Sequence, residues 1–297
     1  MNNLVGVLGA SSHVGQALLP LLARDGFDVI AFSRRIGHEN SGDGEFLELD
    51  ETKVIWRAIS SIDAVCADHS IPYWISLAPI RVLPAYFETF KASGAKRIVA
   101  LSSTSRFTKQ NASDPQDQAL AQSFVESEFE LQNWAERHGV EFVILRPTLI
   151  YGLGKDKNIC EIIRLIRKFG FFPLLGGASG LRQPVHCCDV ALACQAALIS
   201  PSAVNKSYNL SGGEVLSYRE MVARVFQVLQ RKPRFFNMPV GLLRVMMVLL
   251  SLIPRYRKWS FAMVERMNQD MVFDHTEAER DLGFKPRGFS LSADDLP

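Results

Sequence analysis

Two glycines near the start of the chain have the spacing of a phosphate-binding turn. Gly9 and Gly15 stand between an apolar run and an amphipathic segment, which indicates a strand, a tight turn and a helix. This order directs the free N–H groups and the positive dipole end of the helix at the turn, where a dinucleotide pyrophosphate can bind. An ordinary strand–helix turn is the alternative. We expect cofactor contacts from Gly9, Ser11, Ser12, His13, Val14 and Gly15.

A serine and two arginines follow at the position that distinguishes the two nicotinamide dinucleotides. In units of this kind, an acidic residue about twenty residues after the glycines binds the ribose hydroxyls. This chain has Ser33, Arg34 and Arg35 there instead. A guanidinium pairs bidentately with a 2′-phosphate, which a carboxylate would repel. We therefore expect NADP rather than NAD, unless both arginines simply solvate the end of a strand.

Further candidates for cofactor contact follow the later strands. Asp50 could bind the adenine amino group, or be an ordinary turn residue. The run Leu101–Ser105 carries four hydroxyls, and we assign its Ser102 to the cofactor site. Residues that let a ribose lie close to the backbone follow another strand: Leu77, Ala78 and Pro79. Parallel strands end at one edge of a sheet, so we expect these residues to lie together.

Strand and helix signals alternate through the first two thirds of the chain. After the first strand, further strands are expected at Phe27–Ser33, Glu45–Leu49, Pro72–Ala78, Arg97–Ser102 and Val140–Leu145. Helices are expected at Val54–Ser61, Leu83–Ala92 and Asp117–Arg137. This alternation predicts an α/β fold, a doubly wound parallel Rossmann sheet with a smaller mixed α/β C-terminal lobe.

Glycine-bearing loops after residue 151 mark a change of organisation. We assign residues 1–150 to a dinucleotide-binding domain, to which residues 184–212 return. Residues 151–183 and 213–297 then form a small substrate or partner lobe. In this lobe, Ser217 and Glu220 predict a capping box at the start of a helix.

The bulk composition limits the classes of partner. A net charge of +2 over 297 residues gives no sign of a nucleic-acid partner. The five cysteines and six histidines lack metal-ligand spacing, so we expect no metal site and a reduced, cytoplasmic protein. The first residues lack the basic leader of a signal peptide. Nothing in the sequence indicates an oligomeric state.

One apolar segment, Val240–Ile253, is followed by basic residues. As a helix it would be about 21 Å long, shorter than the roughly 30 Å hydrocarbon core of a bilayer. It also contains Arg244, so we do not expect it to span a membrane. It is either a buried helix of the small lobe or a peripheral membrane contact through residues 240–258.

Six short motifs occur in order along almost the whole chain: Gly9-Ala-Ser-Ser-His-Val-Gly15, Leu77-Ala78, Ser102-Ser103, Leu145-Arg-Pro-Thr-Leu-Ile-Tyr-Gly152, Val185-His-Cys-Cys-Asp-Val190 and Asp281-Leu-Gly-Phe-Lys-Pro286. Together they resemble the extended short-chain dehydrogenase/reductase family, the group of nucleotide-sugar epimerases and dehydratases. The resemblance implies a Rossmann domain, a C-terminal substrate lobe and a cleft between them. It also implies that Pro147 borders the nicotinamide and that Ser103 stands at the catalytic serine or threonine position.

The same resemblance implies where a substrate would bind. In active relatives, the regions around Asn158 and Arg182 hold a nucleotide-sugar diphosphate, and we expect these two residues to contact the substrate. The alternatives are a helix cap for Asn158 and a surface salt bridge for Arg182. His186 and Asp189 are expected to tie a loop to the following helix.

The chain departs from the family at its proton-transfer pair. The family uses Tyr-x-x-x-Lys on the helix before the sixth strand, where the lysine lowers the tyrosine pKa. Those positions are Leu120 and Phe124 here, which cannot transfer a proton. The remaining candidates for catalysis are Ser103, Lys109 and Tyr151, the last through the spacing Tyr151-Gly-Leu-Gly-Lys155. The Tyr151 spacing could also be chance or serve a substrate loop, and Lys109 could be a solvated loop lysine.

Two functions therefore stay open. Without the tyrosine and lysine, the chain resembles the atypical members of the family. Its C-terminal third resembles the branch related to the nucleotide-binding accessory subunit of respiratory complex I. The residues that carry this resemblance are Met238-Pro-Val-Gly-Leu-Leu243 and Asn268-Gln-Asp-Met-Val-Phe-Asp274. The first function is an NADP(H)-dependent oxidoreductase or epimerase with a rearranged proton donor, acting on a nucleotide-sugar-like or other small anionic substrate. The second is a non-catalytic cofactor-binding scaffold or redox sensor.

Overall fold

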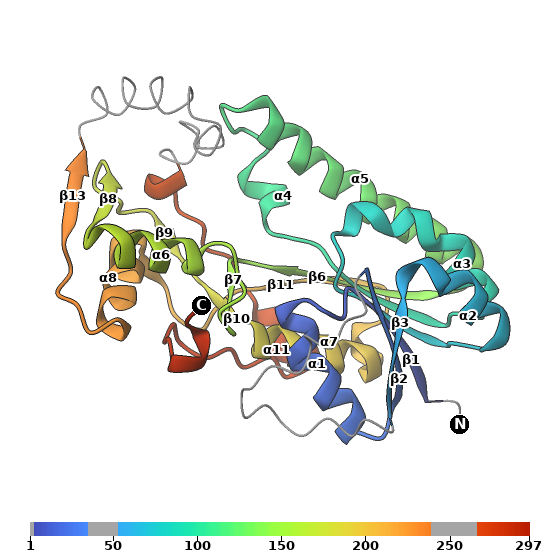
Figure 1. The fold of residues 1–297 in the computed structure, drawn as a ribbon. Coiled ribbons are helices and arrows are strands. Elements are labelled where there is room, and N and C mark those ends of the chain that lie inside the picture. The colour runs from blue at the N-terminus through green and yellow to red at the C-terminus, as the bar shows by residue number, and fades with distance from the viewer. Residues whose placement is uncertain (1–2, 35–52, 239–265) are drawn as a thin grey trace.

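A computed structural model describes residues 3–34, 53–238 and 266–297. Seven parallel strands form one sheet in the order β11-β6-β5-β4-β1-β2-β3 (Figure 1). They are β1 (Leu4–Leu8), β2 (Asp28–Ser33), β3 (Val54–Ala58), β4 (Tyr73–Ser76), β5 (Arg97–Leu101), β6 (Glu141–Pro147) and β11 (Lys206–Leu210). The strand order reverses between β1 and β4, and ligands of such sheets bind outside the carboxyl ends of the strands at this point. The predicted fold class is confirmed.

Alternate residues of the central strands face opposite cores. In β5, Val99 and Leu101 belong to the core on one face of the sheet, and Ile98 and Ala100 to the core on the other. Every residue of this strand is buried. This is the pattern of a parallel strand that helices cover on both faces.

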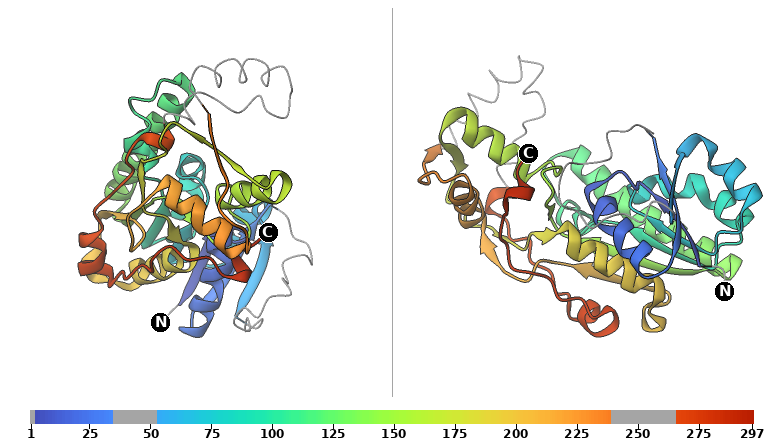
Figure 2. Two further views of the ribbon diagram at one scale, coloured as in Figure 1. Left: turned by 90° about the vertical axis from the view of Figure 1, so that its left-hand side faces the viewer. Right: turned by 60° about the horizontal axis from the view of Figure 1, so that its bottom comes forward.

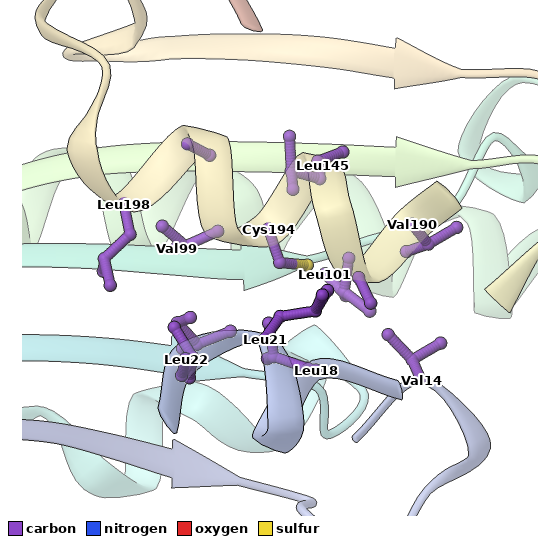
Figure 3. Packing of buried hydrophobic residues seen from close by; sticks show 14 of the residues in the cluster. Val14, Leu18, Leu21, Leu22, Val99, Leu101, Leu145, Val190, Cys194 and Leu198 are labelled. Atoms are coloured by element: carbon purple, nitrogen blue, oxygen red, sulfur yellow. The ribbon is translucent and has the colours of Figure 1, made fainter. Parts of the chain in front are cut away.

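Helices α1 (His13–Arg24), α7 (Cys187–Ile199) and α11 (Thr276–Leu282) lie on one face of the sheet (Figure 1). Figure 3 shows α1 and α7 packed side by side, with apolar side chains such as Leu18 and Cys194 meeting between them. At the far end of α1, the Gln195 amide donates a hydrogen bond to the Asp25 carboxylate at 2.5 Å. The two helices are therefore joined along most of their length.

Helices α2 (Ile62–Asp68), α3 (Phe87–Ala92) and α5 (Pro115–His138) cover the opposite face (Figure 1). Aromatic rings fill this layer: the ring centroids of Trp74 and Phe90 lie 4.9 Å apart. Two short 3-10 segments, Ile59–Ser61 and Ile80–Tyr86, precede α2 and α3. The short helix α4 (Ser105–Thr108) follows the end of β5.

The second lobe lies at the end of the molecule away from β1–β3 (Figure 2). Its helices are α6 (Ile159–Phe169) and α8 (Tyr218–Val228), which share a core of their own. Short strand pairs accompany them: β7 (Ile150–Tyr151) with β10 (Val185–His186), β9 (Leu181–Arg182) with β12 (Leu216–Ser217), and β8 (Phe172–Leu175) with β13 (Phe235–Met238). The capping box of Ser217 and Glu220 starts α8 as predicted.

One secondary-structure prediction was wrong, and others fall outside the described residues. The segment Val54–Ser61, expected to be helical, forms β3 and a 3-10 turn. Its β-branched and aromatic side chains suit the pleated edge of a sheet. The expected strand Glu45–Leu49 and the apolar segment Val240–Ile253 lie outside the described residues. Within the described part of the chain, no helix is long and apolar enough to cross a bilayer.

A buried carboxylate connects α5 to the ends of β5 and β6. Glu128 is 2% exposed and accepts a hydrogen bond of 2.5 Å from Ser102 Oγ. It also pairs with the guanidinium groups of Arg106 and Arg146, the latter at 2.7 Å. Removing one partner of a buried ion pair leaves the other charge uncompensated, so this carboxylate should be structurally important.

We therefore expect Glu128→Leu to lower the free energy of unfolding by about 3–5 kcal/mol, because two largely buried arginines lose their counter-charge. Urea unfolding followed by circular dichroism measures this change. Glu130→Leu, at an exposed position of the same helix, is the control and should change stability by no more than about 0.5 kcal/mol. Equal effects of the two substitutions would contradict the assignment.

Candidate functional site

The predicted phosphate-binding turn needs its two glycines for different reasons. Gly9 has a φ of +75°, and a β-carbon there would lie 2.9 Å from the backbone nitrogen of Ala78. A β-carbon on Gly15 would overlap the carbonyl oxygen of Ala10. Gly9 allows the turn to lie beside the end of β4. Gly15 allows α1 to start close against the turn.

Serine hydroxyls shape the same turn. Ser12 is the N-cap of α1, and its Oγ accepts a hydrogen bond from the Gly15 N–H at 3.1 Å. Ser11 is exposed and accepts from the Ser33 hydroxyl at 3.1 Å, which links the turn to the end of β2. Val14 is buried in the core, so only its backbone can face a ligand. These two hydrogen bonds fix the turn at the start of α1 and beside the end of β2.

The other predicted cofactor residues have different surroundings. Arg34 is exposed directly after β2, whereas Arg35 and Asp50 lie outside the described residues. After β4, Leu77 and Ala78 are half-buried and Pro79 is exposed. Ser102 and Pro147, the last two of these residues, make hydrogen bonds within the protein. The Ser102 hydroxyl donates to Glu128, and the buried Pro147 accepts from the Thr104 N–H through its carbonyl.

A pocket of about 610 Å³ opens beyond the carboxyl ends of β5 and β6, with walls from both lobes. It brings together five residues that the sequence analysis singled out in segments far apart: His13, Ser103, Lys109, Asn158 and Arg182. Asn158 makes no capping hydrogen bond with its side chain, because Asp156 accepts the N–H groups at the start of α6 instead. The Asn158 side chain therefore does not cap α6, which was the alternative interpretation of this residue.

The pocket carries an excess of positive charge that the sequence analysis missed. Its lining includes five basic side chains and a single acidic one, Asp156. The basic ones are Lys109, Lys155, Lys157, Arg182 and Arg266. Asp117 pairs with both Lys109, at 2.6 Å, and Arg266, at 3.4 Å. One carboxylate thus serves two cations, and the pocket suits an anionic ligand.

Arg182 is the most unusual of these cations, because it is only 5% exposed. Its guanidinium donates to the backbone carbonyls of Leu181, Gln269 and Arg266 and lies over the ring of Tyr218. Among the described residues it forms no ion pair, which excludes the alternative of a surface salt bridge. Burial lowers the pKa of Arg182. A buried cation held by neutral carbonyls keeps its charge available to a bound anion.

His13 also lines this pocket, although the sequence placed it only in the glycine turn. Its Nε2 atom is buried and has no hydrogen-bond partner among the described residues. Burial is the main cause that lowers the pKa of His13, which favours the neutral ring. Buried polar atoms normally have a partner, which makes this nitrogen a candidate for ligand contact.

Tyr151 does not line the pocket, whereas Ser103 and Lys109, the other two candidates for catalysis, do. The alternation of β7 turns Ile150 towards the pocket and Tyr151 into the core of the second lobe. The tyrosine is fully buried against His186 and Phe289, and burial raises its pKa to about 12. Lys155, at the other end of that spacing, lines the pocket and donates to Gln16 Oε1 at 2.9 Å.

The two positions of the usual proton-transfer pair lie on α5. Leu120 is half-buried and Phe124 packs against the core beneath α5. Neither belongs to the lining of the pocket. Ser103, by contrast, lines it and accepts a hydrogen bond from the Ser105 N–H at 3.1 Å.

Comparisons with known proteins extend these observations. Residues 5–211 match the NAD dependent epimerase/dehydratase family. Over 107 residues, 36% of this chain and 26% of the relative, the sequence is 32% identical to NADH dehydrogenase (ubiquinone) 1 alpha subcomplex subunit 9, mitochondrial, from Arabidopsis thaliana. It is 25% identical to UDP-glucose 4-epimerase of Vibrio cholerae over 60% of this chain and 52% of that enzyme. The matches thus span about a quarter and about half of these two relatives.

Solved structures share the fold over nearly the whole length. UDP-glucuronic acid 4-epimerase from Bacillus cereus, in complex with UDP-glucuronic acid and NAD, has a TM-score of 0.72 at 16% identity, covering 98% of this chain and 96% of that one. UDP-glucose 4-epimerase from Thermotoga maritima, with UDP-glucose, has a TM-score of 0.69 at 15% identity, covering 98% and 95%. From the family match over residues 5–211 and this shared fold, we conclude that the chain belongs to the NAD-dependent epimerase/dehydratase family.

Proposed function

We propose that this protein binds NADP(H) at the glycine turn and acts as an oxidoreductase or epimerase on a small anionic substrate of the nucleotide-sugar type. The observation that carries the proposal is the pocket of about 610 Å³, in which five basic side chains face one acidic side chain. Its volume is within the range of about 300–1,000 Å³ that is typical of small-molecule sites. The Bacillus cereus enzyme of the same fold binds UDP-glucuronic acid and NAD, which supports this class of ligand.

The preference for the phosphorylated cofactor rests on charge at the end of β2. Gly9 and Gly15 allow a diphosphate to approach the start of α1, whichever dinucleotide binds. Arg34 is exposed immediately after β2, and Arg35 follows it in the sequence. Two guanidinium groups without a neighbouring acid in the sequence favour a 2′-phosphate over free ribose hydroxyls.

Within the pocket, Arg182 is the best candidate to bind a substrate diphosphate. Its carbonyl partners fix the guanidinium in one orientation without neutralising it. Lys157 is exposed at the rim and adds a second positive charge close to the start of α6. Arginine binds phosphate oxygens bidentately, so this pair would position the substrate as well as attract it.

Proton transfer must come from side chains other than tyrosine and lysine on α5. A bound nicotinamide supplies hydride transfer, and the protein must exchange a proton with the substrate oxygen. Ser103 can donate a hydrogen bond to that oxygen. Lys109 can supply a positive charge or a proton, and the neutral His13 ring can accept one.

A second candidate is a non-catalytic cofactor-binding scaffold or redox sensor. It is favoured by Leu120 and Phe124, since loss of an acid–base group typically costs about 10²–10⁴-fold in rate. The partial similarity to the Arabidopsis subunit of NADH dehydrogenase is consistent with this candidate.

We expect NADPH to bind about tenfold or more tightly than NADH, because only NADPH offers a phosphate to the two arginines. Calorimetric titration of the full chain measures both affinities. The double substitution Arg34→Gln with Arg35→Gln should remove the difference, and Arg24→Gln, at the exposed end of α1, should preserve it. Equal affinity in the unsubstituted protein, or tighter NADH, would refute the preference.

We expect the protein to bind UDP, and Arg182→Gln to weaken that binding about tenfold or more, because a charge-assisted hydrogen bond contributes about 1.5–3 kcal/mol. Lys157→Gln, at the exposed rim, should weaken it less. Arg164→Gln removes an exposed charge of α6 outside the pocket and is the control. Unchanged thermal melting shows which variants fold, and UDP binding that none of them alters would place the ligand elsewhere.

We expect sustained NADPH oxidation with a member of a panel of nucleotide sugars, quinones and aldehydes. Ser103→Ala, Lys109→Met and His13→Phe should each reduce the rate about 10²–10⁴-fold if the residue exchanges the proton. Leu120→Ala and Phe124→Ala should leave catalysis in place. Tight NADPH binding with no turnover on any compound would instead favour the scaffold.

A further inference from the structure

Three phenylalanine residues form an exposed cluster on the second lobe. Phe169 ends α6, Phe171 directly precedes β8, and Phe236 belongs to β13. The ring centroids of Phe169 and Phe171 lie 6.1 Å apart, as do those of Phe171 and Phe236. The three residues are 49%, 39% and 49% exposed, respectively. Contiguous exposed apolar side chains, unlike single ones, indicate a binding surface.

Strand pairing explains why two of these rings face outwards. β8 and β13 pair in parallel, with Phe235 opposite Phe172, and lie at the end of the molecule farthest from β1–β3 (Figure 1). Phe172 is buried, and Phe235 packs against Phe226 in the core of the lobe. Successive side chains of a strand point to opposite faces, so the neighbouring Phe171 and Phe236 turn away from this core. The inward rings supply the core, and the outward rings leave much of their surface in water.

Basic side chains surround the exposed rings. Lys168 Nζ lies 5.0 Å from the ring centroid of Phe169. The Arg231 guanidinium donates a hydrogen bond of 2.8 Å to the Ile166 carbonyl, in the last turn of α6. The Arg234 carbonyl accepts one of 2.9 Å from the first residue of β8. Together with the three phenylalanines, five exposed basic residues form what we call the aromatic–basic patch: Arg167, Lys168, Arg231, Lys232 and Arg234.

The positive charge of the patch is not balanced locally. Residues 162–180 and 221–238, which contribute the patch, contain no aspartate or glutamate. Within the described ranges of the chain, none of the five basic residues forms an ion pair. On α6, the carboxylate of Glu161 pairs with Arg164 instead. The net charge of the whole chain is only +2, so this surface concentrates positive charge.

We propose that the aromatic–basic patch docks on the surface of a bilayer that contains anionic phospholipids. Lysine and arginine side chains are attracted to anionic headgroups, and aromatic rings enter the boundary between headgroups and acyl chains. The patch offers both kinds of side chain on one surface. Charge and apolar contact then act together, as stable attachment of a peripheral protein requires.

Two other occupants match the patch less well. Single-stranded nucleic acids stack their bases on the faces of aromatic rings. Here the neighbouring rings are tilted by 45° and 63° against one another, so they offer no common stacking platform. A second copy of the chain would bring like charges together if the two patches met, and like charges at an interface oppose association.

The larger pocket lies at the other end of α6. This helix has 11 residues, which makes it about 16 Å long. It begins after Asn158, which lines the pocket of about 610 Å³, and ends at Phe169. Docking through the patch therefore does not need to cover the pocket, and it is independent of the function proposed above. The apolar segment Val240–Ile253 lies outside the described residues and is not part of the patch.

Cosedimentation of the full chain with phospholipid vesicles tests the proposal. We expect binding to phosphatidylcholine vesicles that contain about 30% phosphatidylserine, and at least tenfold weaker binding to phosphatidylcholine alone. Raising the salt concentration from about 0.1 M to about 0.5 M should weaken the binding, because salt screens the attraction. A protein that stays in the supernatant with anionic vesicles at low salt would overturn the proposal.

Matched phenylalanine variants show whether the exposed rings take part. The triple substitution Phe169→Ser, Phe171→Ser and Phe236→Ser should weaken vesicle binding about tenfold or more, because it removes the apolar contact. Phe129→Ser changes a residue of α5 that is 62% exposed and lies outside the patch. This control should bind vesicles as the unsubstituted protein does.

Lysine variants test the charge separately. Lys168→Gln and Lys232→Gln should each weaken vesicle binding about fivefold, which corresponds to the roughly 1 kcal/mol that a basic side chain contributes at an anionic surface. Lys91→Gln removes an exposed charge of α3 and should have no effect. Thermal melting shows which variants fold, and the lysine variants keep the test decisive if the triple variant does not.

Three results would assign the contact differently and refute the proposal. Folded patch variants that bind vesicles like the unsubstituted protein would place the lipid contact in another segment. Self-association without vesicles, measured by analytical ultracentrifugation and lost in the triple variant, would make the patch an interface between copies. Binding of labelled single-stranded RNA that is tighter than vesicle binding and lost in the triple variant would make it a nucleic-acid site.

Discussion

The close approach of α1 to the turn that precedes it is the constraint on which the rest of the structure depends. Gly15 permits it, because any β-carbon there would overlap the Ala10 carbonyl. With α1 seated against the sheet, α7 can pack along it, and the chain segments before α7 are brought to the same edge. The position of His13, which starts α1 and lines the pocket of about 610 Å³, therefore depends on the absence of a β-carbon at Gly15.

The larger pocket illustrates how charge can be buried without being cancelled. Arg182 obtains its hydrogen bonds from three carbonyls, and Asp117 is shared between Lys109 and Arg266. Asp156 is occupied at the start of α6. In each arrangement the polar groups are hydrogen-bonded, but few carboxylates are present to neutralise the cations. The result is an electropositive cavity in a protein whose overall charge is close to neutral.

The sequence predicted most of the parallel sheet, but not the surroundings of the candidate site. Strands such as β5 were predictable because a short apolar run between turns, here residues 98–101, is typical of a buried strand. The edge strand β3 was missed because only part of it is buried, with Ile55 47% exposed. The spacing Tyr151 to Lys155 suggested a pair, yet strand alternation turns the tyrosine into a core. No sequence signal joins His13, Arg182 and Arg266, because their proximity arises only when the two lobes assemble.

The position of β11 has a consequence for synthesis of the protein. Between the end of β6 at Pro147 and the start of β11 at Lys206, the chain leaves the sheet and builds β7 to β10, α6 and α7. Parallel pairing across so long a separation closes a large loop and is slow. While the nascent chain lacks residues 206–210, β6 has an open edge, and such edges invite pairing with other chains. β11 covers this edge of β6 only after two thirds of the polypeptide has left the ribosome.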